Sequence, residues 1–452
     1  MRPALATLCL LCCACGSRTD TPWAVDGGVI RDPQGRVVVM RGANVSGHHK
    51  FPPFFDFHHA ADFEHMRVQW GMNAVRYLTT WAAVEPQSGQ IDHAYLDQLA
   101  SRVGEATDAG LLVFVDMHQD LYGLGFPGGD GAPDWTCDAG NYAAYTPQDP
   151  WFLGYLTPQV AGCVDGFWGS RELQQHFADA WAAVALRLKD DQGVIGFDPL
   201  NEPYWGSAQL DLFEPRKLAP FYAKVIGEVR AQCPQWLVFA EPASSRNLGF
   251  ASHLPPLGVD GVVYAPHSYD GDAEQGKPFT PAHEQAVYDN LAALKAEADT
   301  LGAALVIGEY GGQIQLDGIR DYMATERHAM DQQLAGATYW DDSLGGGYAL
   351  LDDDGGERPV LLDEVAVPAP DRIAGTPVSF GFESDGGTFS LRYRPDRSLS
   401  APTIIAVPER TWPGGFDVGC DGCKHHAAPG QLIIDEPATG DEVELTLRGI
   451  SR

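Results

Sequence analysis

The chain is poor in positive charge. Its 452 residues include 30 lysines and arginines against 61 aspartates and glutamates, which gives a formal net charge of -31 at pH 7. No basic run of binding length is present. This balance argues against nucleic acid and anionic membrane surfaces as electrostatic partners, and it favours neutral or weakly charged substrates. A hydrophobic content of 44% excludes a disordered chain and allows a large core.

The start of the chain lacks an apolar run of membrane-spanning length. Residues 4–14 are apolar and follow Arg2, but they are too few to cross a bilayer, which is typical of an export signal. Cys15 follows the small residue Ala14 and precedes a polar stretch, which resembles a bacterial lipoprotein cleavage box with Cys15 as the lipid-bearing residue. Cys12 stands where that box usually has leucine. We therefore expect export, followed either by attachment to the cell envelope through Cys15 or by secretion.

Cysteine is scarce beyond this signal, where five remain, and an exported context favours disulfides over metal ligation. Cys137 and Cys163 flank a loop rich in glycine, proline and aromatic residues. Cys420 and Cys423 can close a tight turn, which leaves Cys233 unpaired. The alternative for the second pair is a zinc site that also uses the neighbouring His425 and His426. A second cysteine pair of the usual spacing is missing for that site.

Strand-like and helix-like patterns alternate along the first three quarters of the chain. The strand-like runs are residues 37–40, 74–77, 111–116, 196–200, 236–241, 261–265, 304–309 and 336–340. Amphipathic helical patterns cover residues 95–109, 171–188, 220–231 and 282–301, and Gly110 and Gly302 are placed as helix stops. Alternation of this kind predicts parallel strands, and eight repeats predict a closed (β/α)8 TIM barrel in the α/β class. An open doubly wound sheet is the runner-up, but a glycine-rich phosphate fingerprint is missing after the first strand.

The pattern changes at two places and predicts three parts. Residues 1–21 form the signal and tether, residues 22–366 the catalytic barrel, and residues 367–452 a small C-terminal β-sandwich with short alternating runs after a proline-rich joint. Within the barrel, residues 121–165 have little periodicity. A long loop after the third strand usually shapes the substrate site.

Two acidic motifs carry the chemistry. Asn201-Glu202-Pro203 follows one apolar strand-like run, and Gly308-Glu309 closes another more than a hundred residues later. Carboxylates at the ends of two barrel strands are how this fold presents the acid pair of glycoside hydrolysis. In a retaining mechanism, Glu202 protonates the leaving oxygen and Glu309 attacks the anomeric carbon. Asn201 is placed to hydrogen-bond a sugar hydroxyl beside that carbon.

These motifs resemble glycoside hydrolase family 5. Asn201-Glu202-Pro203 matches its acid/base motif and Glu309 its nucleophile, and further matches are Arg76, His118, His267, Tyr269 and Trp340. More narrowly, Asp116-Met117-His118-Gln119-Asp120-Leu121-Tyr122, the early Arg41-Gly42-Ala43-Asn44, the loop containing Trp135 and the terminal sandwich resemble endoglycoceramidases and related glycosphingolipid hydrolases.

The resemblance implies a role for each matched residue. Arg76 is expected to hold Glu309 ionised by lowering its pKa, and Tyr269 to donate to the same carboxylate. We expect His267 to orient the sugar or the acid, and Trp340 to supply an apolar platform for a pyranose face. His118 and Asp120 are expected to bind sugar hydroxyls. Lys50 is expected to reach the same subsite, although the first loop departs from the family there.

The implied substrate is a glycosphingolipid, cleaved between glycan and ceramide by a monomeric enzyme without cofactor or metal. His48 and His49 could invite a metal, but no third ligand of useful spacing is visible. Apolar residues of segments 51–57, 121–135 and 151–156 are expected to line a ceramide groove, with Phe126 and Trp135 in its wall.

Two alternatives remain open at the level of the sequence. An endo-β-glucanase or β-mannanase would need an open polysaccharide cleft in place of the apolar groove. A surface lipoprotein that only binds glycan or lipid would use the barrel without its chemistry. The presence of Glu202, Glu309 and Arg76 argues against this second alternative.

Overall fold

The computed structural model describes residues 22–450, so the predicted signal and Cys15 lie outside the described residues. Eight parallel strands close a barrel in the order β4-β5-β6-β7-β8-β9-β11-β12, and the short β10 extends its rim beside β11. The strands are β4 (Arg41–Val45), β5 (Ala74–Thr80), β6 (Leu112–His118), β7 (Val194–Asp198), β8 (Leu237–Ala240), β9 (Val262–Tyr264), β10 (His267–Ser268), β11 (Ala304–Tyr310) and β12 (Gly336–Asp342). The predicted (β/α)8 barrel is confirmed.

Helices surround the barrel because the strands are apolar on both faces; every residue of β5, β6 and β11 is buried. The four predicted helices are present as α3 (His93–Asp108), α6 (Arg171–Leu188), α8 (Ala219–Arg230) and α10 (Pro281–Leu301). The remaining helices are α1 (Ala60–Val68), α2 (Trp81–Val84), α4 (Ala139–Ala144), α5 (Pro158–Gly169), α7 (Leu210–Phe213), α9 (Gly271–Glu274), α11 (Ile319–Gln332) and α12 (Pro359–Val365). Gly302 ends α10 in the left-handed conformation that glycine adopts readily.

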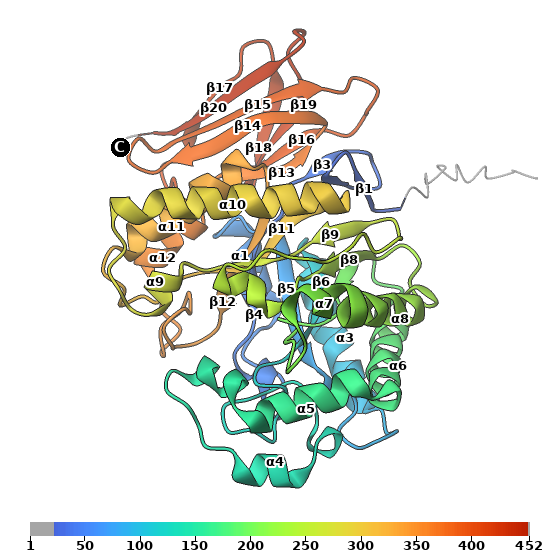
Figure 1. Cartoon of the computed structure of the whole chain (residues 1–452). Helices are drawn as coiled ribbons and strands as arrows, with labels where there is room; N and C mark the ends of the chain where they lie inside the picture. The colour runs from blue at the N-terminus through green and yellow to red at the C-terminus, as the bar shows by residue number, and fades with distance from the viewer. Residues whose placement is uncertain (1–21, 451–452) are drawn as a thin grey trace, which may run out of the picture.

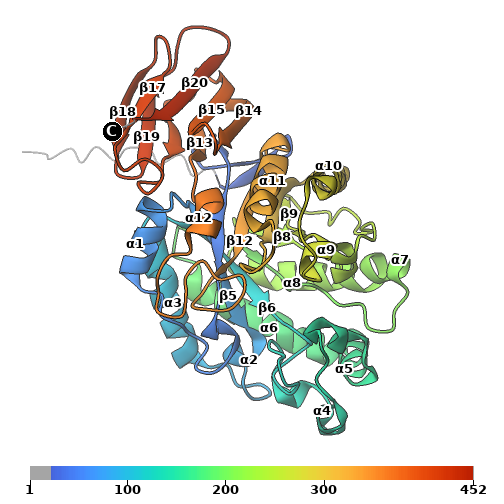
Figure 2. The same cartoon turned by 90° about the vertical axis from the view of Figure 1, so that its left-hand side faces the viewer.

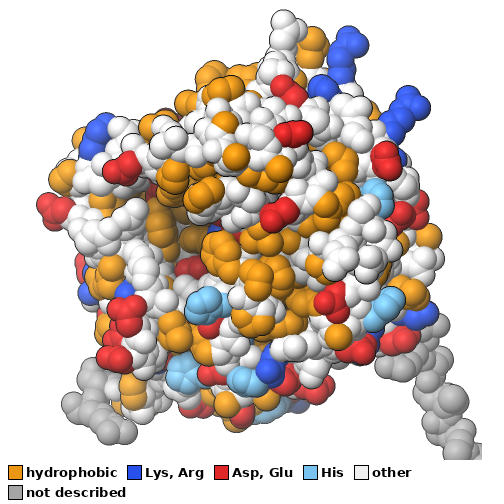
Figure 3. Space-filling model, turned by 90° about the horizontal axis from the view of Figure 1, so that it is seen from below, with side chains coloured by type: hydrophobic (Ala, Val, Ile, Leu, Met, Phe, Trp, Pro, Cys, Tyr) orange, Lys and Arg blue, Asp and Glu red, His pale blue; other side chains and the backbone are white. Residues whose placement is uncertain are grey.

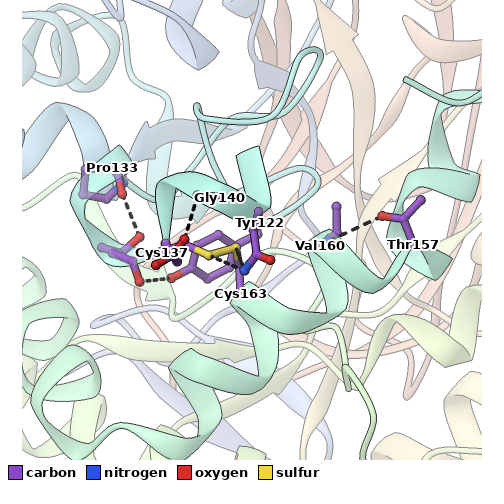
Figure 4. Close-up of a disulfide and its surroundings, with 10 residues drawn as sticks. Tyr122, Pro133, Cys137, Gly140, Thr157, Val160 and Cys163 are labelled. Carbon is purple, nitrogen blue, oxygen red and sulfur yellow. Dashed lines mark hydrogen bonds between the residues drawn. A yellow bond between two sulfur atoms is a disulfide. The ribbon is translucent and has the colours of Figure 1, made fainter. Parts of the chain in front are cut away.

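The long insertion after β6 is more regular than the sequence predicts. It contains α4, α5 and the short helical turns η2 (Asp134–Thr136) and η3 (Trp151–Leu156). Cys137, directly after η2, and Cys163 of α5 form a disulfide, with Cα atoms 5.3 Å apart (Figure 4). The predicted pairing is therefore present, and it ties α5 to the end of η2 across the segment that holds α4 and η3.

A β-sandwich follows the barrel, as predicted. Its four-stranded sheet has the order β14-β15-β20-β17 and its seven-stranded sheet the order β1-β2-β3-β13-β16-β19-β18. The strands are β1 (Ala24–Asp26), β2 (Val29–Arg31), β3 (Val37–Val38), β13 (Ala369–Ile373), β14 (Gly375–Glu383), β15 (Thr388–Pro395), β16 (Thr403–Ala406), β17 (Phe416–Gly419), β18 (Lys424–Ala428), β19 (Gln431–Glu436) and β20 (Val443–Gly449).

The N-terminal strands differ from the prediction. Residues 37–40 were expected to form the first barrel strand, but β3 pairs with β13 of the sandwich and the barrel begins with β4. The physical reason is that Val37, Val39 and Ile373 share an apolar cluster with the sandwich interior. The segment before the barrel therefore completes the C-terminal sheet.

The sandwich and the insertion lie at opposite ends of the barrel, the sandwich at the top of the view and α4 and α5 at the bottom (Figures 1 and 2). Since β6 runs into the insertion, the lower end is the carboxyl end of the strands, where active sites of this fold occur. Within residues 22–450, no helix combines the length and the hydropathy needed to cross a membrane.

Cys420 and Cys423 are joined in a tight turn of the sandwich, and Cys233 is buried and free.

Candidate active site

The two predicted catalytic carboxylates converge at the carboxyl end of the barrel. Glu309 belongs to β11, and Glu202 lies in the loop after β7. One carboxylate oxygen of each lies within 4.8 Å of the other and of a ring nitrogen of His267. Retaining glycosidases hold their carboxyl groups about 5–5.5 Å apart, whereas inverting enzymes leave about 6.5–9.5 Å for a water molecule. The separation fits retention.

Arg76 fixes the nucleophile side of this pair. Its side chain is fully buried, and Nη1 donates to Oε1 of Glu309 over 2.8 Å. Nη2 donates to Oδ1 of Asn201 over 2.8 Å, so that one guanidinium orients both the nucleophile and the amide next to the acid/base. Nη1 also donates to Oδ1 of Asn44, whose amide in turn bonds the backbone carbonyl of Gly308. The expected contact between Arg76 and Glu309 is present.

The net effect on the nucleophile differs from the prediction. Burial raises the pKa of Glu309 above its ordinary value, while His267 and Arg76 act to lower it and Glu202 to raise it. Arg76 acts to lower the pKa of Glu309, as predicted, but its positive charge is shared among several carboxyl groups. Asp116, Asp198 and Glu241 also lie within 3.0 Å of Nη2. One buried cation facing four carboxyl groups cannot neutralise all of them, so burial prevails at Glu309.

Glu202 receives two side-chain contacts at the same oxygen. His267 Nδ1 lies 2.8 Å from Oε1, and the amide of Asn247 donates to Oε1 over 2.7 Å. Burial acts to lower the pKa of His267, but the carboxylates of Glu241 and Glu309 raise it well above its ordinary value. The contact with Glu202 fits orientation of the acid, one of the two roles that we expect for His267.

Tyr269 lies on the other side of the nucleophile. Its hydroxyl donates to Oε2 of Glu309 over 2.9 Å, as predicted. Burial and the Glu309 carboxylate raise the pKa of Tyr269 well above its ordinary value, so the phenol keeps its proton and remains a donor. With Arg76 on Oε1 and Tyr269 on Oε2, both oxygens of Glu309 are positioned.

A cationic subsite lies beside the acid pair. Lys50 Nζ lies 2.5 Å from Asp120 Oδ2 and 3.7 Å from Asp130 Oδ2, and 4.6 Å from the ring centroid of Trp340. The Trp340 ring stacks on His118, with centroids 5.3 Å apart. The structure thus brings together Lys50, His118, Asp120 and Trp340, which the sequence predicted from three separate segments. Ammonium, carboxylate, imidazole and an aromatic face form a suitable surface for sugar hydroxyls and a pyranose ring.

Among residues 22–450, three clusters of acidic and histidine side chains have the spacing of metal ligands: the Glu202–His267–Glu309 set and two others. In the set of His118, Asp120 and Asp130, Lys50 already supplies a cation; in the set of Asp116, Asp198 and Glu241, Arg76 does. The two histidines of the first loop have separate partners. His48 faces Asp56, whereas the buried His49 contacts the Ser46 carbonyl and the Tyr77 hydroxyl.

With the exception of the buried Arg76, the site residues predicted from the sequence line one cleft of about 1130 Å³. Its polar part holds Lys50, Asp120, Glu202 and Glu309. Its apolar part is a wall that we define as Trp151, Phe152, Leu153, Leu156, Trp205 and Leu248. Leu156 and Leu248 are 67% and 64% exposed, and together with the exposed Trp151 and Phe152 they form an apolar patch of the kind that marks a binding surface. The face of the molecule seen from below is hollowed and rich in apolar side chains (Figure 3).

The apolar wall corrects part of the groove prediction. Segment 151–156 lines the cleft as expected, and so does Phe51. Phe126 is buried against Tyr142 and Tyr145 instead, and Trp135 packs on Trp81. Both rings pack against aromatic side chains, which withdraws them from the solvent. They therefore support the insertion from within.

Sequence reasoning missed several residues of the site. Glu241, Asp198 and Asp130 ended strands or loops without a motif, although a carboxylate at the end of an apolar barrel strand is itself a signal. Trp205 lies in a loop, and Asn247 and Leu248 lie in the short 3-10 helix η5 (Ser244–Leu248); the sequence has no periodicity at either place, and we find no signal that identifies these residues.

Comparisons with known proteins agree with this geometry. Residues 32–344 match the family model described as cellulase (glycosyl hydrolase family 5), and residues 368–447 match the glycoside hydrolase family 5 C-terminal domain. Endoglycoceramidase I of Rhodococcus hoagii is 30% identical over 93% of this chain and 86% of its own.

Solved structures give the same result. Endo-glycoceramidase II from a Rhodococcus species, in complex with ganglioside GM3, superposes with a TM-score of 0.83 at 30% identity, over 93% of this chain and 99% of its own. An endogalactoceramidase superposes with a TM-score of 0.77 at 25% identity, over 95% of this chain and 100% of its own. With the acid pair, its arginine and the two matched domains, the chain belongs to glycoside hydrolase family 5.

Proposed function

We propose that this glycoside hydrolase releases intact glycans from glycosphingolipids by cleaving the β-glycosidic bond to the primary hydroxyl of ceramide. The observation that carries the proposal is that one cleft combines the acid pair and the polar groups around Lys50 with an exposed apolar wall. The polar groups around Lys50 suit the hydroxyls of a glycan, and the apolar wall suits a lipid.

The wall lies on the leaving-group side because it is joined to the acid/base. Asn247 donates to Glu202 and is followed directly by Leu248 of the wall. Tyr155, within the same turn as Leu153 and Leu156, packs on Tyr204, two residues after Glu202. The group that departs with the proton of Glu202 therefore leaves toward apolar side chains. Each methylene buried there contributes about 0.8 kcal/mol to binding.

The geometry supports a two-step reaction. In the first step Glu309 attacks the anomeric carbon, the bond to the ceramide oxygen breaks, and that oxygen takes the proton of Glu202. In the second step Glu202 takes a proton from water, whose oxygen attacks the anomeric carbon and displaces Glu309. The products are a free oligosaccharide and a ceramide, and both carboxyl groups return to their starting states.

The relatives support the lipid substrate over a polysaccharide. The endoglycoceramidases named above cover nearly the whole chain, the sandwich included. A family 5 endo-β-glucanase or β-mannanase is the alternative, and it requires hydroxyl-binding groups where this chain has Trp151, Leu156 and Leu248.

Product analysis distinguishes the two. The enzyme is incubated with lactosylceramide in detergent micelles and, separately, with soluble cello- and manno-oligosaccharides. We expect lactose and ceramide from the first and little turnover of the others. Turnover of the oligosaccharides with an intact glycolipid would refute the lipid assignment while leaving the glycosidase assignment in place.

Variants of the wall test the same point from the binding side. Leu156→Ser and Leu248→Ser should raise KM for lactosylceramide by about 10-fold each, since each removes several apolar carbons from the aglycone site. They should leave a short chromogenic β-glycoside nearly unaffected. Leu186→Ser is the matched control, because Leu186 is also exposed but lies on α6, away from the cleft.

Export, a monomeric state and the assignment of catalysis to the barrel belong to the same proposal. An enzyme that acts on glycolipids from outside the cell must be exported to reach them. A lipid attached to Cys15 would then retain it at the cell envelope. Metabolic labelling with a radioactive fatty acid, compared between the native chain and Cys15→Ser, tests attachment. Light scattering should give a mass near 48.9 kDa less the signal if the enzyme is a monomer.

A further inference from the structure

A buried carboxylate beneath the acid pair has no assigned role. Glu241 follows β8, is 2% exposed, and does not line the cleft. Its main-chain carbonyl accepts from the hydroxyl of Tyr222 on α8 over 3.0 Å, which anchors it to the helix layer. It therefore cannot contact a substrate directly, and any effect it has on the reaction passes through its neighbours.

Those neighbours are the three groups that set the geometry of catalysis. Oε2 of Glu241 accepts from the backbone N–H of Glu202 over 2.9 Å. Oε1 accepts from Arg76 Nη2 over 2.9 Å and lies 3.2 Å from Nε2 of His267. Glu241 thus contacts the acid/base, the arginine of the nucleophile and the imidazole between them.

The backbone of Glu202 explains why such a contact is needed. Its φ of +42° lies in the left-handed region, where side chains other than glycine, asparagine and aspartate are rarely found. Such a conformation persists only where surrounding groups hold it. Glu241 holds the N–H of this residue, and Gln119 Nε2 holds its C=O over 3.1 Å. Without these two contacts the peptide is free to relax and to move the carboxyl group away from the sugar.

The imidazole provides the second link. His267 Nδ1 lies 2.8 Å from Glu202 Oε1, and its buried Nε2, which makes no hydrogen bond, lies 3.2 Å from Glu241 Oε1, so the Glu241 carboxylate electrostatically favours the form of the ring that carries a proton on Nε2. Every partner of the Glu241 carboxylate is then a donor. An amide in its place would have to turn an N–H₂ group toward one of them.

We propose that Glu241 is a positioning residue that locks Glu202 in its left-handed backbone conformation and His267 in the Nε2-protonated form, and so keeps the acid/base aligned with the leaving oxygen. The charged and titratable groups that face it are Arg76 from β5, Asp116 from β6, Asp198 from β7, Tyr222 from α8, His267 from β10 and Glu202 itself. Burial and Asp198 raise the pKa of Glu241, His267 and Arg76 act to lower it, and the net effect is upward.

The test compares Glu241→Gln and Glu241→Asp with the native enzyme on two chromogenic β-glycosides, one with a good leaving group that needs no protonation and one with a poor leaving group. Both substrates lack a lipid, so the result is independent of the proposed ceramide specificity. We expect kcat for the poor leaving group to fall by about 100-fold, at the lower end of what general acid catalysis contributes. KM and the glycosylation rate with the good leaving group should change by less than about 5-fold, and the alkaline limb of the pH profile should shift.

Equal losses on both substrates with an unchanged pH profile would overturn the proposal, because a general structural defect predicts that pattern. Activity within 3-fold of native on the poor leaving group would overturn it as well. Glu364→Gln is the control for loss of a buried glutamate bonded to arginine, since Glu364 contacts Arg327 far from the cleft.

A measurement on the native chain covers the case in which the Glu241 variants do not fold. In protein labelled with ¹⁵N-histidine, the His267 ring signal, assigned by its loss in His267→Asn, should show a proton on Nε2 that exchanges slowly with water. An unprotonated Nε2 would contradict the proposed lock.

Discussion

The hydroxyl of Tyr269 donates to Oε2 of Glu309 over 2.9 Å, opposite the Arg76 contact at Oε1. The nucleophile is therefore gripped at both oxygens in a site where burial works against its ionisation. Each donor favours the charged form, so their removal has a predictable sign.

The acid limb of the pH profile should reflect this balance. Because burial raises the pKa of Glu309 and the reaction needs its carboxylate, kcat/KM should fall, with decreasing pH, at a pH above the ordinary glutamate value of 4.5. Tyr269→Phe removes a donor to the carboxylate and should move the limb further upward, by about 1 unit. Initial rates on a chromogenic β-glycoside between pH 3 and 8 measure it. A limb at or below 4.5 would contradict the assignment.

Replacement of either catalytic carboxyl group should abolish most activity. Glu202→Gln and Glu309→Gln should each lower kcat by about 1000-fold or more while leaving thermal unfolding nearly unchanged. Azide should restore turnover of activated substrates by Glu202→Ala, with a β-glycosyl azide as product, because Glu309 still forms the covalent intermediate. An α-configured product would exclude the retaining mechanism.

The buried Glu326 of α11 predicts a pH-dependent stability. Burial raises its pKa to about 8 from an ordinary 4.5, and its partner is the hydroxyl of Ser268. Between these two pH values the folded chain binds a proton that the unfolded chain has lost, so the stability contribution falls as pH rises and is gone above about 8. Relative to the native chain, Glu326→Gln should be more stable at pH 9 than at pH 5. Urea unfolding of both proteins at both pH values measures the difference; an equal offset at the two values would refute it.

The disulfide of the insertion should stabilise the apolar wall. Cys137 and Cys163 close a loop with a sequence separation of 26, which corresponds to about 3 kcal/mol in the chain-entropy model. The Cys137→Ala/Cys163→Ala double variant should unfold at lower temperature and bind glycolipid more weakly, since η3 lies within the closed loop. Cys233→Ala is the control for removal of a buried thiol. Non-reducing peptide mapping that finds both thiols free would remove the disulfide from this account.

Lys50 should act on the glycan side alone. The carboxylates of Asp120 and Asp130 outweigh burial and raise the pKa of Lys50, so that it carries its charge throughout the working pH range. Lys50→Met leaves these carboxylates without their cation and should lower kcat/KM by about 100-fold for glycolipids and chromogenic glycosides alike, a loss of about 2.7 kcal/mol in transition-state binding. A loss of activity confined to lipid substrates would contradict this prediction, because it would place Lys50 on the aglycone side of the cleft.

The sequence alone determined the barrel, the sandwich and the acid pair. Apolar runs that alternate with amphipathic helices leave little choice of architecture, and Glu202 and Glu309 end strands whose carboxyl ends must meet at one rim. Lys50, His118, Asp120 and Trp340 follow from motifs in three segments, and the closed barrel brings these segments together.

Only the tertiary structure decided the rest, because the remaining features depend on which distant groups meet. Strand β3 could join the barrel or the sandwich, and the choice depended on apolar contacts with residues more than 300 positions later. Phe126 and Leu248 are both apolar loop residues, yet one is buried and the other forms the wall. Likewise the net pKa of Glu309 follows from a balance of burial, shared charge and neighbours that no local pattern contains. The strand-end motifs identify the catalytic groups. The alignment of these groups by Glu241 and the apolar surface for the aglycone arise from long-range packing.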